Sequence, residues 1–231
     1  MAGHFFRARS AWESSMPSLT SKIHVKMLAS AHRRGTTSEQ KIYGIEWGDP
    51  DKDWALKLVR EQFLKPFIDP SQRALEIGPG GGRWTRYLLS FREVVVVDKH
   101  RELLDELQSK FHLPHLIPVL NNGTDFPGVE PDSVDFVFSF GVFVHLDPWI
   151  IEAYLKALRT IVRPSANVVI QYSDMRKKGA RKQSGFSDND PERMRKMVDT
   201  AGFTILEENV TALFHSAIMR FRRKREGEEM Y

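Results

Sequence analysis

Three glycines at alternate positions are the residues whose spacing most clearly points to ligand chemistry. Gly78, Gly80 and Gly82 follow a short apolar run, and a helical pattern begins at Arg83. Glycine lets the backbone approach a ligand closely, and the first turn of a helix offers unpaired N–H groups. A strand that ends at such glycines and continues into a helix is therefore typical of a cofactor-binding turn.

The spacing of these glycines narrows the choice of cofactor. A dinucleotide fingerprint would have its third glycine at position 83, where this chain has Arg83, and no Gly-Lys-Ser/Thr phosphate-binding sequence follows. A second apolar run ends at Asp98, about 20 positions after Gly78. In nucleotide-binding α/β folds an acid at that separation holds the ribose hydroxyls. The alternatives for Asp98 are a solvated strand end or a cap for the helix that follows.

The run from Glu76 to Gly82, together with Asp98, resembles motif I and the acid-tipped second strand of the class I S-adenosylmethionine (SAM)-dependent methyltransferases. The resemblance covers about residues 53 to 222. It implies that SAM is the cofactor, with the glycines beneath its methionine part and Asp98 at its ribose. It also implies contacts after the third and fourth strands. The expected cofactor residues are Glu76, Gly78, Gly80, Gly82, Asp98, Lys99, Asn122, Gly123, Thr124 and Ser139.

A histidine follows the fourth expected strand, in a segment that runs from Ser139 to Pro148. This segment resembles the part of small-molecule methyltransferases that borders both cofactor and acceptor, where histidine is frequent. A hydroxyl acceptor needs a base, and histidine suits that task near neutral pH. We therefore expect His145 to be the catalytic base, with a helix-cap or core histidine as the alternative. Asp147 could orient its ring or cap the next helix.

Side chains near that segment are expected to contact the acceptor. They are Tyr43, Trp47, Phe143, Tyr172 and Asp174. Some sugar methyltransferases use Mg²⁺ held by carboxylates, so a magnesium site formed by Asp147, Asp174 and Asp188 is a further hypothesis. Their spacing does not define a ligand set.

Alternating apolar and helical patterns predict how these residues are positioned. Strands are expected near 73–77, 93–98, 116–120, 134–139, 167–172, 203–207 and 215–222, and helices over 53–66, 83–90, 101–111, 148–162 and 191–201. Repeated strand–helix units predict an α/β fold with a mostly parallel sheet and helices on both faces. The last two strands lack a helix between them and should form a hairpin. The last strand is therefore antiparallel, as in the Rossmann-like seven-stranded methyltransferase sheet.

Three segments lie outside this repeating pattern. Residues 1–52 are expected to form an N-terminal arm or cap, residues 53–222 the methyltransferase domain, and residues 223–231 a charged tail. The first 38 residues are rich in Arg, Lys and Ser and hold one acid, Glu13, so they suit either a transit peptide or an arm with one amphipathic helix. Residues 173–190, with five basic residues between positions 176 and 182, are expected to be a lid loop.

Composition limits the class of function. The chain of 231 residues has no cysteine, which excludes disulfides, thiolate zinc sites and a cysteine nucleophile. Its 34 Lys and Arg against 30 Asp and Glu do not demand a nucleic-acid partner. No apolar run reaches the length of a membrane span. We therefore expect a cytoplasmic protein that acts on a small molecule.

These observations together favour a SAM-dependent O-methyltransferase acting on a small polar acceptor. The best guess is a saccharide hydroxyl, including the methylated mannosides of mycobacterial type. The alternatives are methylation of RNA or protein, a SAM-fold binding module without activity, and a nicotinamide oxidoreductase, which Arg83 disfavours.

Overall fold

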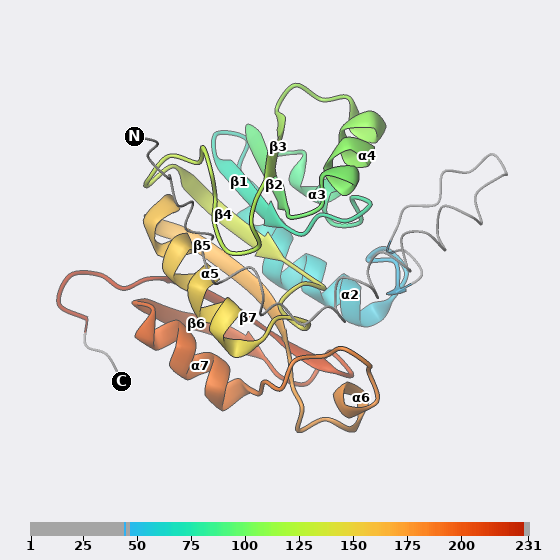
Figure 1. Cartoon of the computed structure of the whole chain (residues 1–231), viewed down its shortest axis with the longest axis vertical. Helices are drawn as coiled ribbons and strands as arrows, with labels where there is room; N and C mark the ends of the chain where they lie inside the picture. The colour runs from blue at the N-terminus through green and yellow to red at the C-terminus, as the bar shows by residue number, and fades with distance from the viewer. Residues whose placement is uncertain (1–43, 45–46, 229–231) are drawn as a thin grey trace, which may run out of the picture. The chain divides into compact units, whose positions relative to one another are not determined.

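The computed structural model describes residues 44 and 47–228, and the structural statements below refer to these residues. They form a seven-stranded sheet in the order β3-β2-β1-β4-β5-β7-β6 (Figure 1). The strands are β1 Arg73–Ile77, β2 Glu93–Asp98, β3 Leu116–Leu120, β4 Val134–Ser139, β5 Val162–Ser173, β6 Phe203–Asn209 and β7 Ser216–Arg223. Strands β1 to β5 pair in parallel, and β7 pairs antiparallel with β5 and β6. The expected mostly parallel sheet with an antiparallel last strand is confirmed.

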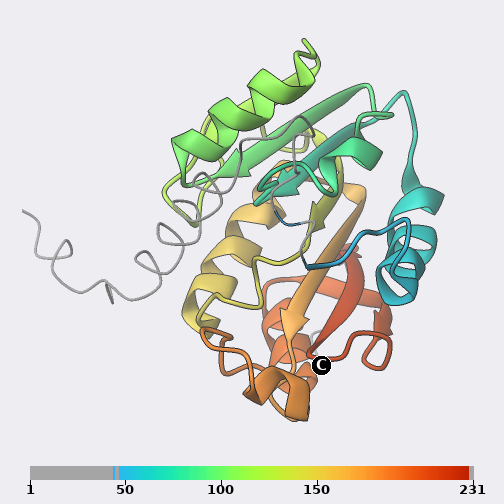
Figure 2. The same ribbon diagram turned by 90° about the vertical axis from the view of Figure 1, so that its right-hand side faces the viewer.

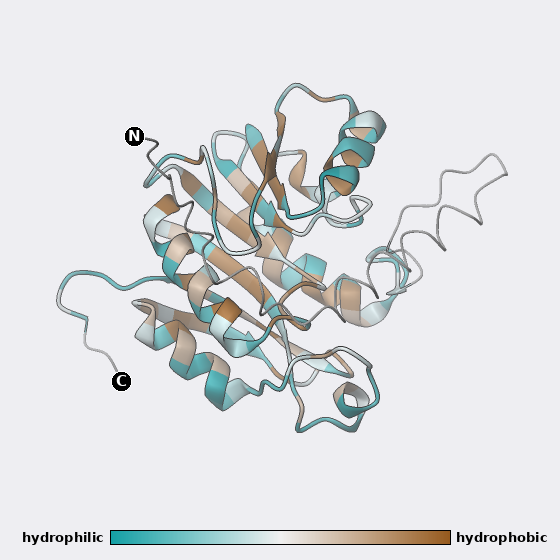
Figure 3. Ribbon diagram, in the orientation of Figure 1, coloured by the Kyte–Doolittle hydropathy of each residue, from teal (hydrophilic) through white to brown (hydrophobic). Residues whose placement is uncertain are grey.

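Helices cover both faces of this sheet (Figure 2). The covering helices are α2 Trp54–Val59, α3 Thr85–Leu88, α4 Arg101–Phe111, α5 Pro148–Ile161 and α7 Pro191–Thr200, and a further short helix, α6 Lys178–Arg181, lies in the loop after β5. One apolar core contains side chains of α5 and α7, and the other contains side chains of α2 and α4. The central strands are largely apolar because both their faces are covered, and Figure 3 shows them mostly brown between partly teal helices.

Strand β2 shows how the sequence produces this two-sided burial. Val95 and Val97 belong to the core beneath α5, while Val94 and Val96 belong to the opposite core, and all four are fully buried. Successive side chains of a strand point to opposite faces, so an unbroken run of valines suits a strand with a helix layer on each side.

Several elements differ in extent from the expectation. The helix expected over 53–66 is α-helical only to Val59 and continues as a π-helix over Arg60–Leu64 and a 3₁₀ turn over Lys65–Phe67. Helix α3 is a single turn, because the glycine turn extends to position 84. Strand β5 begins earlier, at Val162, which pairs with Val134. The predicted arm over 1–52 lies almost wholly outside the described residues.

Candidate functional site

The carboxyl ends of the central strands define the place where a ligand is expected. The chain leaves β1 for β2 and β3 on one side, and β4 and β5 lie on the other side of β1. Ligands of open α/β sheets lie outside the carboxyl ends of the strands at such a reversal of strand order. The turn that follows Ile77 is therefore the centre of the candidate site.

The glycine turn requires glycine for reasons of both conformation and packing. Gly78, Gly80 and Gly82 have φ of 70°, 52° and 84°, in the left-handed region that other residues rarely adopt. A Cβ atom at Gly78 would lie 2.1 Å from Cγ2 of Val142, and one at Gly82 would lie 2.5 Å from Cε2 of Phe111. The turn is thus packed against the segment after β4 and against helix α4. Since α3 has only four residues, helix-dipole binding contributes less here than the sequence suggests.

A buried carboxyl group lies directly before this turn. Glu76 lies between Val96 and Phe138 of the neighbouring strands and is 2% exposed. Oγ1 of Thr85 donates a hydrogen bond to its Oε2 at 2.6 Å. Burial raises the pKa of Glu76 to about 8, against the opposing effects of the Thr85 hydrogen bond and the charge of Arg83. In the ligand-free protein the group is therefore largely protonated near neutral pH.

Asp98 ends β2 on the same edge of the sheet. Its Oδ1 accepts hydrogen bonds from the backbone N–H and from Nδ1 of His100, both at 2.9 Å. The N-cap position of α4 is occupied by His100, so the helix-cap alternative for Asp98 does not hold. Among the described residues no hydrogen bond to Oδ2 is found, so that oxygen can accept from a ligand hydroxyl.

The ends of β2 and β3 meet beside Asp98. The backbone N–H of Asn121 donates to the carbonyl of Asp98 at 3.0 Å, and Cδ of Lys99 lies 3.9 Å from the Cβ position of Gly123. The loop holds its own shape, since Oδ1 of Asn122 accepts from the N–H and the hydroxyl of Thr124, each at 2.9 Å. The structure therefore brings together the cofactor residues expected after these two strands.

His145 follows β4, and a main-chain carbonyl orients its ring. Nδ1 lies 2.9 Å from the carbonyl oxygen of Gly185. A carbonyl only accepts, so Nδ1 carries a proton and Nε2 of the neutral ring carries the lone pair. Burial lowers the pKa of His145, although the bond to Gly185 partly opposes this. In the described part of the chain no hydrogen bond joins Asp147 to His145, whose Nδ1 is held by Gly185, and Asp147 occupies the N-cap position of α5 without a side-chain cap bond.

A second histidine, which the sequence analysis did not identify, lies near the first. Phe186 packs edge-on with both His145 and His215, at centroid distances of 5.1 Å and interplanar angles of 85° and 90°. Ser216, the residue after His215, pairs with Ser173 at the end of β5. The antiparallel direction of β7 therefore brings the start of that strand to the same edge as the ends of β1 and β4. That signal was available, because an antiparallel last strand beginning near position 215 was predicted.

The loop over residues 173–190, expected as a lid, contains the short helix α6 and is hydrogen-bonded both to the segment after β4 and to the turn before β7. The backbone N–H of Ser187 donates to the carbonyl of Val144 at 2.7 Å, and Oγ of Ser173 donates to the carbonyl of Ser187 at 2.8 Å. Nζ of Lys177 donates to the carbonyls of Leu213 and Ser216, both at 2.7 Å. The loop therefore connects the segment after β4 with the turn before β7.

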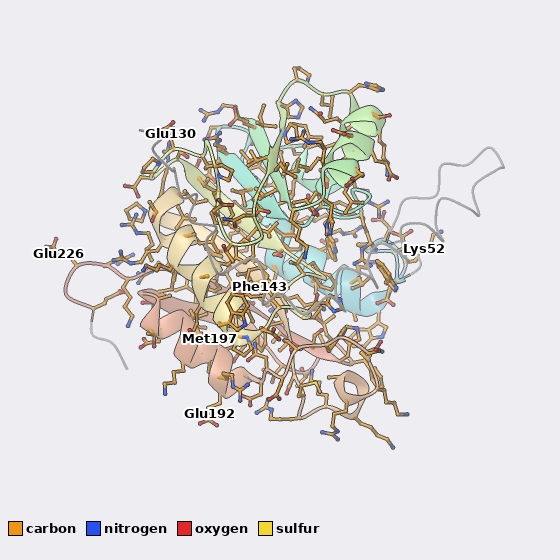
Figure 4. The ribbon with its side chains drawn as sticks, viewed as in Figure 1. Lys52, Glu130, Phe143, Glu192, Met197 and Glu226 are labelled. Carbon is orange, nitrogen blue, oxygen red and sulfur yellow. The ribbon has the colours of Figure 1, made fainter. Side chains whose placement is uncertain are left out.

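Four expected ligand-binding side chains are instead buried within the protein. Phe143 and Tyr172 are fully buried in the core, where Figure 4 shows Phe143 beside α5. Ser139 is fully buried and its hydroxyl donates to the carbonyl of Ile77 at 3.0 Å. Asp174, 1% exposed, is held by Nε and Nη2 of Arg176 at 2.9 and 3.1 Å. In this conformation these side chains support the site and do not line it.

The remaining expected acceptor residues have different outcomes. Trp47 is 52% exposed, and its indole lies 3.5 Å from the Cβ position of Gly44. Tyr43 lies outside the described residues. The magnesium hypothesis receives no support from the described part of the chain, where no three His, Cys, Asp or Glu side chains come together as a metal site. Asp174 is committed to Arg176, while the Asp188 side chain is 86% exposed.

SAM fits the groups that this edge presents. A ligand with an amino-acid moiety and a ribose needs a turn that it can approach closely and a carboxylate that accepts from its ribose hydroxyls. The turn at Gly78–Gly82 and Oδ2 of Asp98 meet these needs, and the buried Glu76 lies directly before the turn. The loops after β2 and β3, tied together at Asn121, form the adjoining side.

Comparisons with known proteins bear on the family and the fold. Residues 74–165 match the sequence model of a family described as a methyltransferase domain. The chain resembles the putative methyltransferase solved in a complex with the Trm112 methyltransferase activator of Haloferax volcanii, with 14% identity, a TM-score of 0.67, and coverage of 89% of this chain and 99% of that one. It also resembles magnesium protoporphyrin IX methyltransferase from Synechocystis PCC 6803 with bound SAH, with 14% identity, a TM-score of 0.65, and coverage of 90% and 99%.

A third similar structure is the CcbJ methyltransferase from Streptomyces caelestis, with 18% identity, a TM-score of 0.61, and coverage of 77% of this chain and 99% of that one. Comparison with curated proteins gives no match. The similar structures support the fold, and the matching family model supports a methyltransferase domain over residues 74–165. None of the helices in the described part of the chain has the length and apolar character that a bilayer crossing requires.

Proposed function

We propose that this methyltransferase domain moves the methyl group of SAM to a hydroxyl group of a small polar acceptor, with a saccharide as the best candidate. The observation that carries the proposal is the hydrogen bond between Nδ1 of His145 and the carbonyl of Gly185. It leaves the lone pair on Nε2, so the ring can accept a proton from a hydroxyl at the carboxyl edge of the sheet.

The state of His145 near neutral pH supports this role. Burial disfavours the charged imidazolium and lowers the pKa of the ring, so it is neutral at pH 7. SAM, when bound, supplies a methyl group that is already activated by the sulfonium. The protein therefore needs to align the acceptor, exclude water and remove one proton, and His145 can perform the last of these tasks.

The preference for a saccharide rests on two supports. The first is the likeness of the chain to sugar and natural-product O-methyltransferases in its Trp-Gly-Asp-Pro entry and in the loop after β5. The second is the presence of exposed aromatic side chains on segments at this edge: Trp149 in the first turn of α5 is 60% exposed, and Phe214 before β7 is 73% exposed. Aromatic rings offer an apolar face to the C–H groups of a sugar ring.

The second candidate is a macromolecular acceptor, RNA or protein. The exposed cations Lys178, Arg181 and Lys182 on and beside α6 favour it. Binding that depends on phosphate contacts weakens steeply with salt, whereas recognition of a neutral sugar does not. Methyl transfer to a tRNA or rRNA fraction that disappears between 50 and 200 mM salt, roughly the range over which such contacts are lost, would favour the second candidate.

The decisive experiment is a labelled-methyl transfer screen over mono- and oligosaccharides, phenols, amines and RNA. Once an acceptor is found, His145→Ala should reduce kcat by about 10²-fold or more, while SAM affinity stays near that of the wild type. His115, which lies before β3 and bonds the Leu89 carbonyl away from the site, provides a matched control as His115→Ala.

The pH dependence has a definite sign. The active form requires the lone pair on Nε2, so the rate should rise with pH through the titration of His145. Because burial lowers this pKa, the rise should be centred below the ordinary histidine value. A folded His145→Ala enzyme with normal kcat would show that His145 is not the base, and one that fails to fold would make it a structural residue.

A further inference from the structure

The side chain of His215 presents an unusual combination of burial and missing contacts. Its Nδ1 is buried, and among the described residues no hydrogen-bond partner is found for it. The side chain as a whole is only half-buried, so the ring keeps an accessible edge. Phe186 packs against the ring at 5.1 Å, and Lys177 bonds the carbonyls of Leu213 and Ser216 on either side of it.

The burial of Nδ1 indicates which nitrogen carries the proton. A buried N–H group without a partner is rarer in proteins than a buried acceptor without one. The proton of the neutral ring is therefore better placed on Nε2. The ring is neutral because its pKa is lowered. Burial is the largest cause, and the charge of Lys177 and the nearby His145 lower the pKa further. His215 thus offers an N–H donor at its accessible edge.

His145 has the opposite arrangement. Its Nδ1 donates to Gly185, so its Nε2 is an acceptor. Both imidazole rings pack against the phenyl ring of Phe186, and the centroid of each imidazole lies 5.1 Å from the phenyl centroid. The two imidazole centroids are therefore at most twice that distance apart. One edge of the sheet therefore carries a basic imidazole and a donating imidazole within the span of a small polar molecule.

We propose that His215 is a second acceptor-binding residue, which donates a hydrogen bond from Nε2 to another oxygen of the molecule whose hydroxyl gives its proton to His145. The acceptor class that this pair selects is a molecule with at least two oxygen functions, such as a sugar or another polyol, in preference to a simple alcohol. This inference rests on the proposed function, and it assigns His215 to binding and not to proton removal.

The tautomers can be tested without an acceptor. In ¹⁵N-labelled full-length protein loaded with S-adenosylhomocysteine, side-chain NMR at pH 7.5 should show the proton of His145 on Nδ1 and that of His215 on Nε2. A proton on Nδ1 of His215 would overturn the inference, whatever the enzyme acts on.

The binding role is tested with methyl glucopyranoside and its single-deoxy analogues as methyl acceptors. His215→Leu removes the donor and should raise KM for the full sugar by about tenfold, the size of one lost hydrogen bond, with kcat nearly unchanged. His215→Gln keeps an N–H donor and should recover most of this loss. The deoxy analogue that lacks the contacted oxygen should show the same KM with wild type and His215→Leu.

The controls separate this inference from the proposed function. His115→Leu removes a half-buried histidine at the opposite edge of the sheet and should leave KM unchanged. An unaltered KM in folded His215→Leu would overturn the inference while methyl transfer to sugar stands. If wild type methylates no sugar, the saccharide proposal fails, and the tautomer of His215 then decides the inference alone.

Discussion

Glu76 makes the stability of the ligand-free protein depend on pH in a direction opposite to that of most carboxyl groups. Burial raises its folded-state pKa to about 8, whereas an unfolded chain would have the ordinary value of 4.5. Between these two values the unfolded chain has released its proton and the folded protein has kept it. Stability contributed by this group is therefore full below pH 4.5 and is lost as pH rises toward 8.

The size of the effect follows from the two pKa values. Each pKa unit corresponds to about 1.4 kcal/mol, so the gap between 4.5 and about 8 amounts to about 5 kcal/mol at most, reached above pH 8. Glu76→Gln replaces the carboxyl group by a neutral amide of nearly the same shape, whose oxygen can still accept from Thr85. The new amide N–H groups are buried, and one left without a partner costs about 1–3 kcal/mol.

The expected outcome is a difference between variant and wild type that grows with pH. Near pH 5 Glu76→Gln should be equal to or less stable than wild type, and near pH 8.5 its free energy of unfolding should have gained about 3–5 kcal/mol relative to wild type. Urea unfolding of the ligand-free protein at several pH values measures this. The exposed Glu130, which Figure 4 labels, gives the matched control Glu130→Gln, which makes the same substitution at a carboxyl group that is not buried.

A flat difference for Glu76→Gln between pH 5 and 8.5 would show that Glu76 is already ionised in the folded protein. The buried site would then contain a compensating charge other than Arg83, and the reasoning from burial would be refuted. Other groups titrate in the same range, but they are present in both proteins and cancel in the comparison.

Two further predictions concern the cofactor and the loop. Asp98→Ala should weaken SAM binding by about 1.5–3 kcal/mol, the size of a hydrogen bond to a charged group. Gly80→Val should abolish binding, because φ at Gly80 is 52°, in the left-handed region that valine rarely adopts. Calorimetry that finds unaltered affinity in both variants would contradict the assignment of SAM to this turn. Within residues 173–190, amide exchange should be fastest at the exposed positions 184–185 and slow at Ser187, whose N–H bonds the Val144 carbonyl. SAM with acceptor should protect the fast positions, and equal exchange in the free and ternary states would make the segment an ordinary surface loop.

The strands could be predicted from the sequence because their apolar runs are short, buried on both faces and bounded by turn residues. Helix α6 could not, since Lys178–Arg181 is basic and contains glycine. Tertiary contacts hold it, because Gly179 packs against Phe214, where a Cβ would lie 2.6 Å from the ring and from the backbone oxygen. Local propensity gives no sign of such a contact.

The sequence could predict which residues lie at the ends of strands, but it could not predict the direction of their side chains. Gly78 and His145 follow a strand and Asp98 ends one, and strand ends meet at one edge whatever the side chains do. Tyr172 also lies near a strand end, but its neighbour Ser173 is the last residue of β5, and Tyr172 points into the core with Met194. A shift of one residue along a strand exchanges the buried and the opposite face.

The contact between His145 and Gly185 has a consequence for how the site works. Gly185, whose carbonyl defines the tautomer of the proposed base, belongs to a loop 40 positions further along the chain, and the same loop provides Phe186 and the N–H of Ser187 that bonds the Val144 carbonyl. If the loop moves away, His145 loses the carbonyl that holds its proton on Nδ1, and Nε2 no longer has to be the acceptor. In the proposed mechanism, loop position and the protonation of His145 are therefore coupled, so closure of the proposed lid on the acceptor would also prepare His145 to remove its proton.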